Sequence, residues 1–307
     1  MNNVALIFPG QGSQYLGMCN DDFFKQKPYK TFFDNALDFF GEDILDYCTN
    51  GPVEKLNSTY IAQPAILIHS IILDTLIKKN NLKIKAVAGH SLGEYTALIS
   101  AGVISYKDCM NILKVRCTEM EKANQKYDGS MLAVIHNDIK LIQNICNLLS
   151  ETVIANINSQ NQIIISGPKS EIEKSINILK DNNINRLIKL NVSGAFHSPL
   201  MNEANVSLNK AINSVNFNNA KYAIYQNVSA KKNFDGNEIK KNLMKQLTGT
   251  VNWLDIINNM AKNKIDTIIE LGPKNVLSRL VKKINPNFKV INIDNYNDLK
   301  SNGFNLC

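Results

Sequence analysis

The chain has 307 residues, of which 44% are hydrophobic and 20% are charged; this balance excludes an intrinsically disordered protein and allows a large buried core. Its formal net charge of +7 is dispersed along the sequence, and no aromatic-basic motif of a nucleic-acid-binding module accompanies it. The six cysteines have no C-x-x-C spacing, which argues against a zinc site and a disulfide framework and favours a reducing compartment.

The first predicted element is an apolar strand over residues 4–8, and the sequence shows no charged segment followed by the apolar region of a signal peptide. We expect a cytoplasmic protein, or one of a plastid-like organelle if a transit peptide has been removed. A glycine-rich turn follows the strand, in which Gly10 and Gly12 flank Gln11. Such a turn can present a backbone N–H group to a ligand, although an ordinary tight turn also explains the glycines.

Helical patterns occupy the next stretch, at residues 29–40, 44–47 and 61–78. Pro64 stands near the start of the third helix, where its missing N–H group is tolerated. The apolar run 65–77 within this helix is interrupted by His69 and Asp74 and is too short to cross a bilayer. We therefore expect no membrane association.

An apolar strand over residues 84–88 turns abruptly into a helix, and Ser91 lies at the turn between Gly89 and Gly93. The glycines permit a cramped backbone that exposes the serine oxygen to a substrate. The first N–H groups of the helix, and the positive end of its dipole, point to the place where an oxyanion forms. Because G-x-S-x-G also occurs by chance, these residues alone leave Ser91 as either a nucleophile or part of an ordinary turn.

The next predicted helix, over residues 106–124, carries an arginine in its apolar stripe. Arg116 falls on the same face as Cys109, Leu113 and Met120 by helical spacing. A guanidinium keeps its proton and is costly to bury alone, so an anion must accompany it. That anion is either a carboxylate of the chain, in a structural ion pair, or a carboxylate of a substrate.

From residue 131 onward the predicted elements are strand, helix, strand, strand, helix and strand, at residues 131–136, 138–149, 153–157, 162–166, 170–180 and 184–192. This β-α-β-β-α-β order is typical of a ferredoxin-like sandwich. We therefore expect a small inserted domain at residues 128–194. His136 ends its first strand and is interpreted as a surface or packing residue.

The chain returns from this insertion through a turn of small and polar residues that holds His197, one of only four histidines. A loop histidine is usually without catalytic meaning, but this one lies at a predicted domain junction, where sites tend to form. Strands and helices alternate on both sides of the insertion. We predict an α/β fold with a mostly parallel sheet covered by helices, built from residues 1–127 and 195–307.

A set of motifs stands in the same order along nearly the whole chain: Gly10-Gln11-Gly12-Ser13-Gln14, Gln63-Pro64-Ala65, Gly89-His90-Ser91-Leu92-Gly93-Glu94, Arg116, Ser193-Gly194-Ala195-Phe196-His197-Ser198 and Glu270-Leu271-Gly272-Pro273. Together they resemble the malonyl-CoA:acyl carrier protein transacylases of type II fatty-acid synthesis. The set is specific, although no single motif in it is. The resemblance implies an α/β-hydrolase-like large domain with a ferredoxin-like insert, in agreement with the predicted elements.

By this resemblance, Ser91 is the acyl-carrying nucleophile, and His197 is the base that takes its proton and later returns it to the departing thiol. The main-chain carbonyl of Asn252, at a place where many relatives carry glutamine, is expected to orient the imidazole. The backbone N–H groups of Gln11 and Leu92 are expected to form the oxyanion hole, which needs donors fixed before the reaction.

The resemblance also implies the substrates. Arg116 is expected to bind the free carboxylate of a malonyl group in a bidentate pair, and Gln11, Gln63 and Phe196 are expected at the substrate. Leu92 and Phe196 match the malonyl rather than the methylmalonyl pattern. The substrates are malonyl-CoA and phosphopantetheinyl acyl carrier protein, and no metal or redox cofactor is expected, because the thioester is already activated.

The carrier protein is acidic in the systems of this family, so the resemblance predicts a basic patch beside the cleft. The candidates for that patch are Arg186, Lys189, Lys282 and Lys283. Ordinary solvated surface charge explains each of them equally well.

Three other functions remain open from the sequence. A serine esterase or thioesterase normally has its histidine near the C-terminus, after a buried acid, whereas 110 residues follow His197, and a neutral ester gives Arg116 no role. A non-catalytic module that binds acyl carrier protein should have lost Ser91, His197 or Arg116, and all three are present. A free-standing malonyltransferase of polyketide synthesis would differ only in its carrier.

Overall fold

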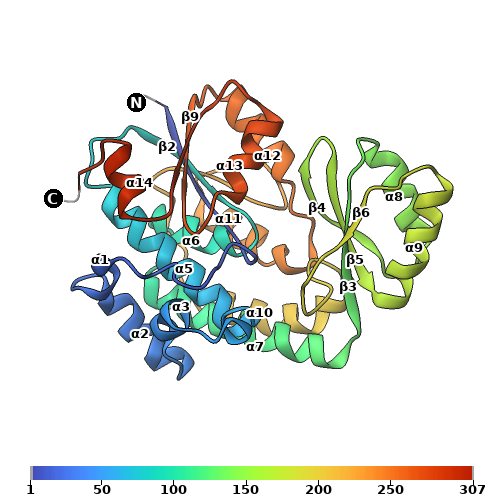
Figure 1. Ribbon diagram of the computed structural model, residues 1–307, viewed down its shortest axis with the longest axis horizontal. Helices are drawn as coiled ribbons and strands as arrows, with labels where there is room; N and C mark the ends of the chain where they lie inside the picture. The colour runs from blue at the N-terminus through green and yellow to red at the C-terminus, as the bar shows by residue number, and fades with distance from the viewer. Residues whose placement is uncertain (1–2, 306–307) are drawn as a thin grey trace.

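The computed structural model describes residues 3–305, which form two β-sheets with helices packed around them (Figure 1). In spatial order, the larger sheet contains β10 (Lys289–Ile293), β9 (Thr267–Leu271), β1 (Val4–Phe8), β2 (Ile84–Gly89), β7 (Ala223–Tyr225) and β8 (Lys232–Asn233). Neighbouring strands in this sheet are parallel except for the antiparallel pair of β7 and β8. The predicted α/β fold with a mostly parallel sheet is therefore confirmed.

The sequence of β1 explains why helices cover both faces of this sheet. All five of its residues are apolar and buried. Val4, Leu6 and Phe8 pack into one hydrophobic cluster, whereas Ala5 and Ile7 pack into another. Side chains alternate between the faces of a strand, so a continuous apolar run requires a covering layer on each side.

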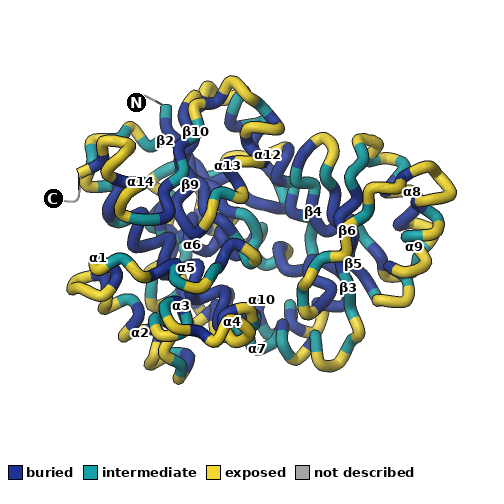
Figure 2. Tube along the Cα trace, viewed as in Figure 1, coloured by how far each residue is buried: buried dark blue, intermediate teal, exposed yellow. Residues whose placement is uncertain are grey.

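Helices α12 (Trp253–Lys262) and α13 (Val276–Ile284) cover the face of Ala5 and Ile7. The cluster on the opposite face includes residues of α1 (Asp22–Lys25), α2 (Lys30–Phe40), α3 (Ile44–Thr49), α4 (Val53–Leu56), α5 (Thr59–Ile77), α6 (Leu92–Ser100), α7 (Tyr106–Lys126), α10 (Asn202–Asn213), α11 (Gly236–Leu243) and α14 (Tyr296–Ser301). In Figure 2 the sheet and the inner helices are mostly buried, and exposed residues mark the outer helices.

Helix α5 is the one helix of the described residues that is long and apolar enough to cross a membrane by length and composition alone. In the folded chain, 89% of its apolar window is buried. His69 and Asp74 within it are also buried, and Figure 1 shows the helix packed among its neighbours. These are the properties of a central core helix, which is hydrophobic all round because other elements surround it.

The smaller sheet has the spatial order β4 (Val153–Ser159), β5 (Gln162–Pro168), β3 (Gly129–Val134) and β6 (Leu187–Lys189), with every pair antiparallel. With α8 (Ile139–Asn147) and α9 (Lys169–Asp181) it forms the lobe at the right of Figure 1. The predicted order of strands and helices is confirmed here. The last strand is shorter than predicted, since it covers Leu187–Lys189 instead of residues 184–192, and Ile184 packs into the lobe's core from the segment before it.

The two sheets meet near the carboxyl ends of the central strands. Phe8 pairs with Gly89, so the loops that follow β1 and β2 leave the sheet side by side. From the smaller sheet, β4 contacts the segment before α12, where Val251 N–H donates to the carbonyl of Ala155 at 2.8 Å. Ligands of open parallel sheets bind at the carboxyl ends of the strands, where neighbouring crossovers diverge. The functional site is therefore expected at this edge of the larger sheet.

Candidate active site

The elbow predicted at Ser91 is present between β2 and α6. Ser91 has φ 51° and ψ −106°, a strained conformation for a residue with a side chain. A Cβ atom on Gly89 would lie 1.8 Å from the carbonyl carbon of Gly93, and one on Gly93 would lie 2.0 Å from the carbonyl oxygen of Phe8. Both positions therefore require glycine, because α6 packs directly onto the ends of β1 and β2.

Asn227 braces the elbow from the end of β7. Its Oδ1 accepts a hydrogen bond from the backbone N–H of Ser91 at 2.7 Å. Its Nδ2 donates to the carbonyl of Gly89 at 2.6 Å. One buried amide thus holds the backbone on both sides of His90, and compensates for part of the strain at Ser91.

Ser91 and His197 lie in direct contact. The distance from Ser91 Oγ to His197 Nε2 is 2.8 Å. On the other side of the ring, His197 Nδ1 lies 2.9 Å from the carbonyl oxygen of Gln246 and 3.1 Å from that of Gly249. Carbonyl oxygens only accept, so the ring proton belongs on Nδ1, and Nε2 is free to accept the proton of the serine.

Burial keeps this histidine neutral. The side chain is 3% exposed, and its pKa is lowered to about 3, chiefly by burial and secondly by the positive charge of Arg116. The hydrogen bond to Gln246 opposes that shift. At neutral pH the imidazole can therefore act as a base toward Ser91.

The prediction that the carbonyl of Asn252 orients the imidazole is wrong. That carbonyl accepts the backbone N–H of Ile256 at 3.1 Å, as expected of the residue that caps the start of α12. The Asn252 side chain instead donates to carbonyls of the preceding loops, including that of Val228 at 2.9 Å. Gln246, which begins a short 3₁₀ turn (Gln246–Thr248), and Gly249, which follows that turn, take the role that we expected of Asn252.

Arg116 is 1% exposed, and its guanidinium lies beside the nucleophile. Its Nη2 donates to Ser91 Oγ at 3.2 Å, and its Nη1 donates to Oε1 of Gln63. The guanidinium carbon lies 5.4 Å from the centre of the Tyr95 ring. Among the described residues, no Asp or Glu side chain forms a salt bridge with it, and its Nε has no hydrogen-bond partner.

The loop after β1 lies against the elbow. A Cβ on Gly10 would lie 2.4 Å from the carbonyl oxygen of His90, so only glycine permits this approach. The Gln11 side chain accepts a hydrogen bond from Gln63 at 3.2 Å, which links it to Arg116. Within residues 3–305, the backbone N–H groups of Gln11 and Leu92 donate to no other group, so both can bind a ligand.

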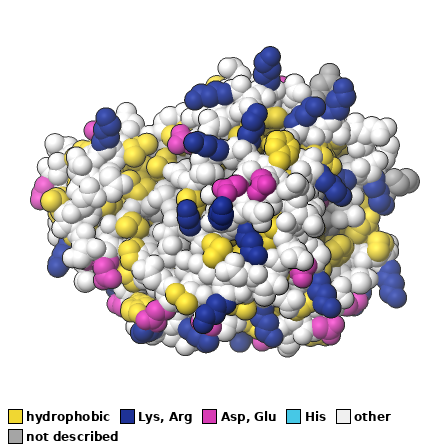
Figure 3. Space-filling view, turned by 180° about the vertical axis from the view of Figure 1, so that it is seen from behind, with side chains coloured by type: hydrophobic (Ala, Val, Ile, Leu, Met, Phe, Trp, Pro, Cys, Tyr) yellow, Lys and Arg dark blue, Asp and Glu magenta, His cyan; other side chains and the backbone are white. Residues whose placement is uncertain are grey.

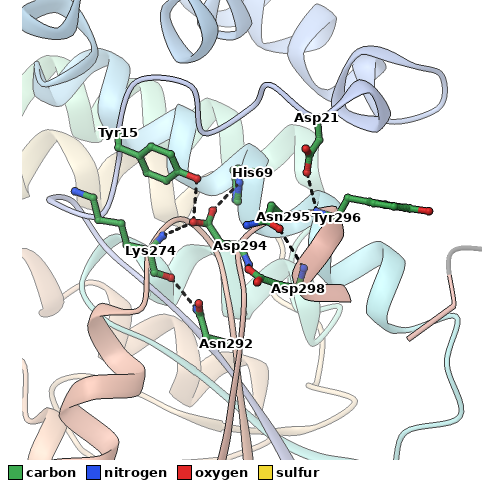
Figure 4. Close-up of polar contacts among 9 residues, drawn as sticks. All are labelled: Tyr15, Asp21, His69, Lys274, Asn292, Asp294, Asn295, Tyr296 and Asp298. Atoms are coloured by element: carbon green, nitrogen blue, oxygen red, sulfur yellow. Dashed lines mark hydrogen bonds and ion pairs between the residues drawn. The ribbon is translucent and has the colours of Figure 1, made fainter. Parts of the chain in front are cut away.

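A second set of contacts anchors this loop to the C-terminal part of the chain (Figure 4). Asp294 accepts hydrogen bonds from the Tyr15 hydroxyl at 2.9 Å and from the Lys274 backbone N–H at 3.0 Å, and the Lys274 ammonium donates to the carbonyl of Gly12 at 3.3 Å. Burial raises the Asp294 pKa to about 6 and lowers the pKa of neighbouring His69 to about 3. The contact of 3.4 Å between His69 and Asp294 is therefore not an ion pair at neutral pH.

The elbow also touches the smaller sheet. His90 Nε2 lies 2.8 Å from Oδ1 of Asn158 in β4, and its ring packs edge-on against Trp253 at a centroid distance of 5.6 Å. Phe196, which precedes His197, is buried in the main hydrophobic cluster. The site therefore lies where the two sheets meet.

The four basic residues proposed for docking are exposed and lie outside this cluster. Arg186 and Lys189 are at β6, where Lys189 contacts Glu173 at 3.5 Å. Lys282 and Lys283, near the end of α13, line two surface hollows, one of which also contains His136. On the face shown in Figure 3, Lys and Arg side chains are spread widely, with acidic side chains among them.

Sequence reasoning gave no role in the site to three residues: Glu94, which it noted only as part of a motif, Asn227 and Gln246. Their hydrogen bonds join positions up to 155 residues apart, and no local pattern encodes such contacts. One signal was available for Asn227, which follows the short strand β7, the neighbour of β2 in the sheet. Polar residues at the carboxyl end of a strand beside the nucleophile strand are candidates for the site.

A serine on a strained elbow, in contact with a neutral histidine at the edge of a parallel sheet, has the geometry of the class of enzymes that move or hydrolyse acyl groups. The acyl transferase domain family matches residues 5–296, so the chain belongs to that family. The resemblance inferred from the sequence is therefore confirmed.

Curated relatives are similar over almost their full lengths. A malonyl CoA-acyl carrier protein transacylase of Bacillus subtilis is 35% identical over 95% of this chain and 93% of its own. One from Staphylococcus aureus is 36% identical over 98% of each chain.

Solved structures agree with the sequence comparisons. An acyl carrier protein S-malonyltransferase from Vibrio cholerae has a TM-score of 0.92 and 32% identity over 97% of this chain and 99% of its own. A malonyl-transacylase in complex with a type II polyketide synthase acyl-carrier protein has a TM-score of 0.92 and 30% identity over 98% of each chain.

Proposed function

We propose that the protein transfers the malonyl group of malonyl-CoA to the phosphopantetheine thiol of an acyl carrier protein, for fatty-acid elongation. The observation that carries the proposal is the buried guanidinium of Arg116, 3.2 Å from Ser91 Oγ and without a carboxylate of the described chain beside it. A malonyl thioester carries a free carboxylate that can pair with this guanidinium while its carbonyl carbon faces the serine. The names of the relatives support the same activity.

In the first half-reaction, His197 Nε2 accepts the hydroxyl proton of Ser91, and Oγ attacks the thioester carbonyl carbon. The backbone N–H groups of Gln11 and Leu92 hold the oxyanion of the tetrahedral intermediate. The carbon–sulfur bond then breaks, and His197 gives its proton to the departing thiolate of coenzyme A. The malonyl group remains as an ester on Ser91.

The second half-reaction reverses these steps with a different thiol. His197 takes the proton of the phosphopantetheine thiol, and the thiolate attacks the ester carbonyl. The bond from carbon to Ser91 Oγ breaks, and the serine recovers its proton from His197. The carbonyls of Gln246 and Gly249 keep the Nδ1 proton in place and stabilise the imidazolium in both half-reactions.

Arg116 and Gln63 account for the choice of acyl group. Gln63 is fully buried and accepts from the guanidinium, which fixes the plane of the Arg116 side chain. An acetyl group would leave this buried charge unpaired, at a cost of about 3–5 kcal/mol. Phe196 and Leu92 flank the catalytic pair, where they limit the space for a branched acyl group.

We further infer that residues 128–194 are a ferredoxin-like domain inserted into an α/β-hydrolase-like domain of residues 1–127 and 195–307. The four antiparallel strands of the smaller sheet and the pair of helices α8 and α9 support this division. The reaction needs no metal or redox cofactor, because a thioester is already activated for attack. The cytoplasm is the proposed location.

A malonyltransferase that serves polyketide assembly is a second candidate. The structural match to a malonyl-transacylase in complex with a polyketide acyl-carrier protein favours it. The two functions share one reaction and differ in the carrier, so transfer rates to carriers of the two kinds, measured side by side, decide between them.

Intact-protein mass after brief mixing with malonyl-CoA tests the reaction itself. We expect an adduct of one malonyl group that requires Ser91, disappears in Ser91→Ala, and moves to acyl carrier protein when this is added. Ser214→Ala, at an exposed serine, serves as the matched control and should form the adduct normally. An absent adduct, or one lost to water as fast without carrier as with it, would favour a hydrolase instead.

A further inference from the structure

Glu94 is a fully buried carboxylate in the first turn of α6, three residues after the nucleophile. Its Oε1 accepts from Gln226 Nε2 at 3.1 Å. Its Oε2 accepts from the backbone N–H of Asn227 at 2.9 Å and from Gln246 Nε2 at 3.2 Å. Every neighbour is therefore an N–H donor, and only a carboxylate can accept from all three without presenting a hydrogen of its own.

Two of these three neighbours hold the reacting pair. Asn227 fixes the backbone of the elbow through Ser91 and Gly89. Gln246 donates to the carbonyl of Ser91 at 2.9 Å, while its own carbonyl accepts from His197 Nδ1. One carboxylate is thus connected to the nucleophile and to the base through a single residue on each path.

The position of Gln246 depends on this carboxylate more than on local structure. The residue begins a 3₁₀ turn of only three residues, which has no regular ladder of hydrogen bonds to fix it. Its side-chain Oε1 is buried without a partner among the described residues, so its Nε2 bonds to Glu94 and Ser91 alone orient the amide.

The pKa of Glu94 is raised above its ordinary value, chiefly by burial. Its hydrogen bonds with Asn227, Gln246 and Gln226 and the positive charge of Arg116 oppose this shift and favour the carboxylate. No salt bridge joins Glu94 and Arg116 among the described side chains, so the carboxylate balances the guanidinium without occupying its hydrogen-bonding edge.

We propose that Glu94 is a positioning residue for acyl transfer: its carboxylate sets the places of Asn227 and Gln246, and thereby aligns Ser91 with His197. The proposal rests on the proposed roles of Ser91 and His197 as nucleophile and base. A purely structural carboxylate would instead stabilise the fold and leave the reaction rate of the folded enzyme unchanged.

Glu270 provides the matched control. It is also fully buried, and its carboxylate accepts from the backbone N–H groups of Leu277 at 3.0 Å and Ser278 at 2.7 Å, at the start of α13. It contacts none of the residues that hold the catalytic pair. Glu94→Gln and Glu270→Gln therefore make the same chemical change, and only the first is connected to Ser91 and His197.

The experiment measures the rate at which Ser91 is acylated in the full chain, by malonyl-CoA and by p-nitrophenyl acetate, an ester without a carboxylate. We expect Glu94→Gln to slow both reactions about 10-fold to 100-fold, with less than about a 3-fold change in KM for malonyl-CoA. Glu270→Gln should lower the unfolding temperature and keep both rates within about 3-fold. Acylation of folded Glu94→Gln at the unsubstituted rate would overturn the proposal.

Gln246→Met keeps the proposal testable if Glu94→Gln does not fold. It removes the side-chain bonds of Gln246 to Glu94 and to the Ser91 carbonyl, and it retains the main-chain carbonyl on His197. We expect it to slow acylation about 10-fold, and an unchanged rate would refute the proposal. Where both variants fold, the double variant should be slowed by less than the product of the two single effects, since part of the effect of Glu94 passes through Gln246. If the two single effects on the acylation rate multiply in the double variant, then Glu94 and Gln246 act independently, and the proposal is contradicted.

The unsubstituted enzyme separates this test from that of the proposed function. If it forms no malonyl adduct but reacts with p-nitrophenyl acetate, then the proposed substrate is wrong, and the Glu94 comparison still stands on the acetate rates. If Ser91 is acylated by malonyl-CoA at the same rate with and without Glu94, then only the positioning role fails.

Discussion

Burial determines the chemistry of single residues in this site. His197 is neutral because its surroundings disfavour the imidazolium. Glu94 is fully buried, and its carboxylate accepts three hydrogen bonds from the chain in place of those from water. Arg116 is held by Gln63 and the Tyr95 ring rather than by a carboxylate of the described chain. Neutral partners thus fix the guanidinium and leave its charge available to an anionic substrate.

Replacement of Arg116 should therefore change the choice of acyl group more than the reactivity of Ser91. We expect Arg116→Ala to slow acylation by malonyl-CoA about 100-fold or more, since a buried charge pair is lost, and to leave acylation by acetyl-CoA unchanged or faster. Arg116→Lys keeps the charge without the bidentate fork and should give an intermediate rate. Equal losses with both thioesters would contradict the assignment.

His197 should also make the fold sensitive to acid. Its pKa is about 3 in the folded chain and about 6.5 when unfolded, so the unfolded state binds the proton more tightly. Its stabilising contribution is complete above about pH 6.5 and is lost as the pH falls toward 3. Between pH 7 and pH 5 we expect the contribution of His197 to the free energy of unfolding to fall by about 2 kcal/mol.

Denaturant unfolding of the unsubstituted chain and of His197→Asn at both pH values measures this contribution. From pH 7 to pH 5, the free energy of unfolding of His197→Asn should fall by about 2 kcal/mol less than that of the unsubstituted chain, whatever the stability of the variant at pH 7. Other groups titrate in both proteins and cancel in the comparison. Identical losses would mean that His197 is not held neutral by the fold.

At the scale of elements, the elbow depends on the close packing of α6 against the ends of β1 and β2. Gly93 is the point of closest approach, because a Cβ there would lie 2.0 Å from the carbonyl oxygen of Phe8. A backbone carbonyl cannot move aside without displacing its strand. The geometry of the nucleophile is therefore a consequence of how a helix and two strands pack together.

Gly93→Ala should accordingly destabilise the fold by at least about 3 kcal/mol, because the new methyl group forces α6 away from β1. Gly41→Ala is the control: Gly41 ends α2 with φ 68°, and a Cβ there meets nothing within 4 Å, so we expect a cost of about 1 kcal/mol. Thermal and denaturant unfolding measure the loss of stability in each variant. An equal loss in Gly93→Ala and Gly41→Ala would show that α6 can move away from β1 without disrupting the fold.

Elements with a periodic pattern were predictable from the sequence, whereas contacts between distant loops were not. The strand and helix around Ser91 and the apolar stripe that contains Arg116 follow local rules, and the structure has both. The assignment of Asn252 failed because the carbonyls that reach His197 come from an irregular turn whose path no periodicity describes. Glu94 was visible as a motif residue, but its partners were not.

At the scale of the whole molecule, the site lies where the two sheets meet, and we predict that a carrier protein approaches along that junction. Lys282 and Lys283 belong to α13, which covers the larger sheet, whereas Arg186 and Lys189 belong to the lobe that contains the smaller sheet (Figure 1). One of the hollows lined by Lys283 is also lined by residues that follow β3 and β4 in the smaller sheet. An acidic carrier that spans the junction could contact cations of both parts.

Reversal of charge at this junction should therefore weaken carrier binding and spare the chemistry. We expect Lys282→Glu with Lys283→Glu to raise KM for acyl carrier protein about 10-fold, and to change KM for malonyl-CoA less than about 3-fold. Lys25→Glu with Lys27→Glu, at exposed positions around α1, which lies at the left of Figure 1 away from the smaller lobe, makes the same change in net charge and should affect neither value. Both KM values are measured in steady-state transfer at two salt concentrations, and the effect on the carrier should shrink as salt screens it. A rise of equal size for both substrates would mean that these lysines do not dock the carrier.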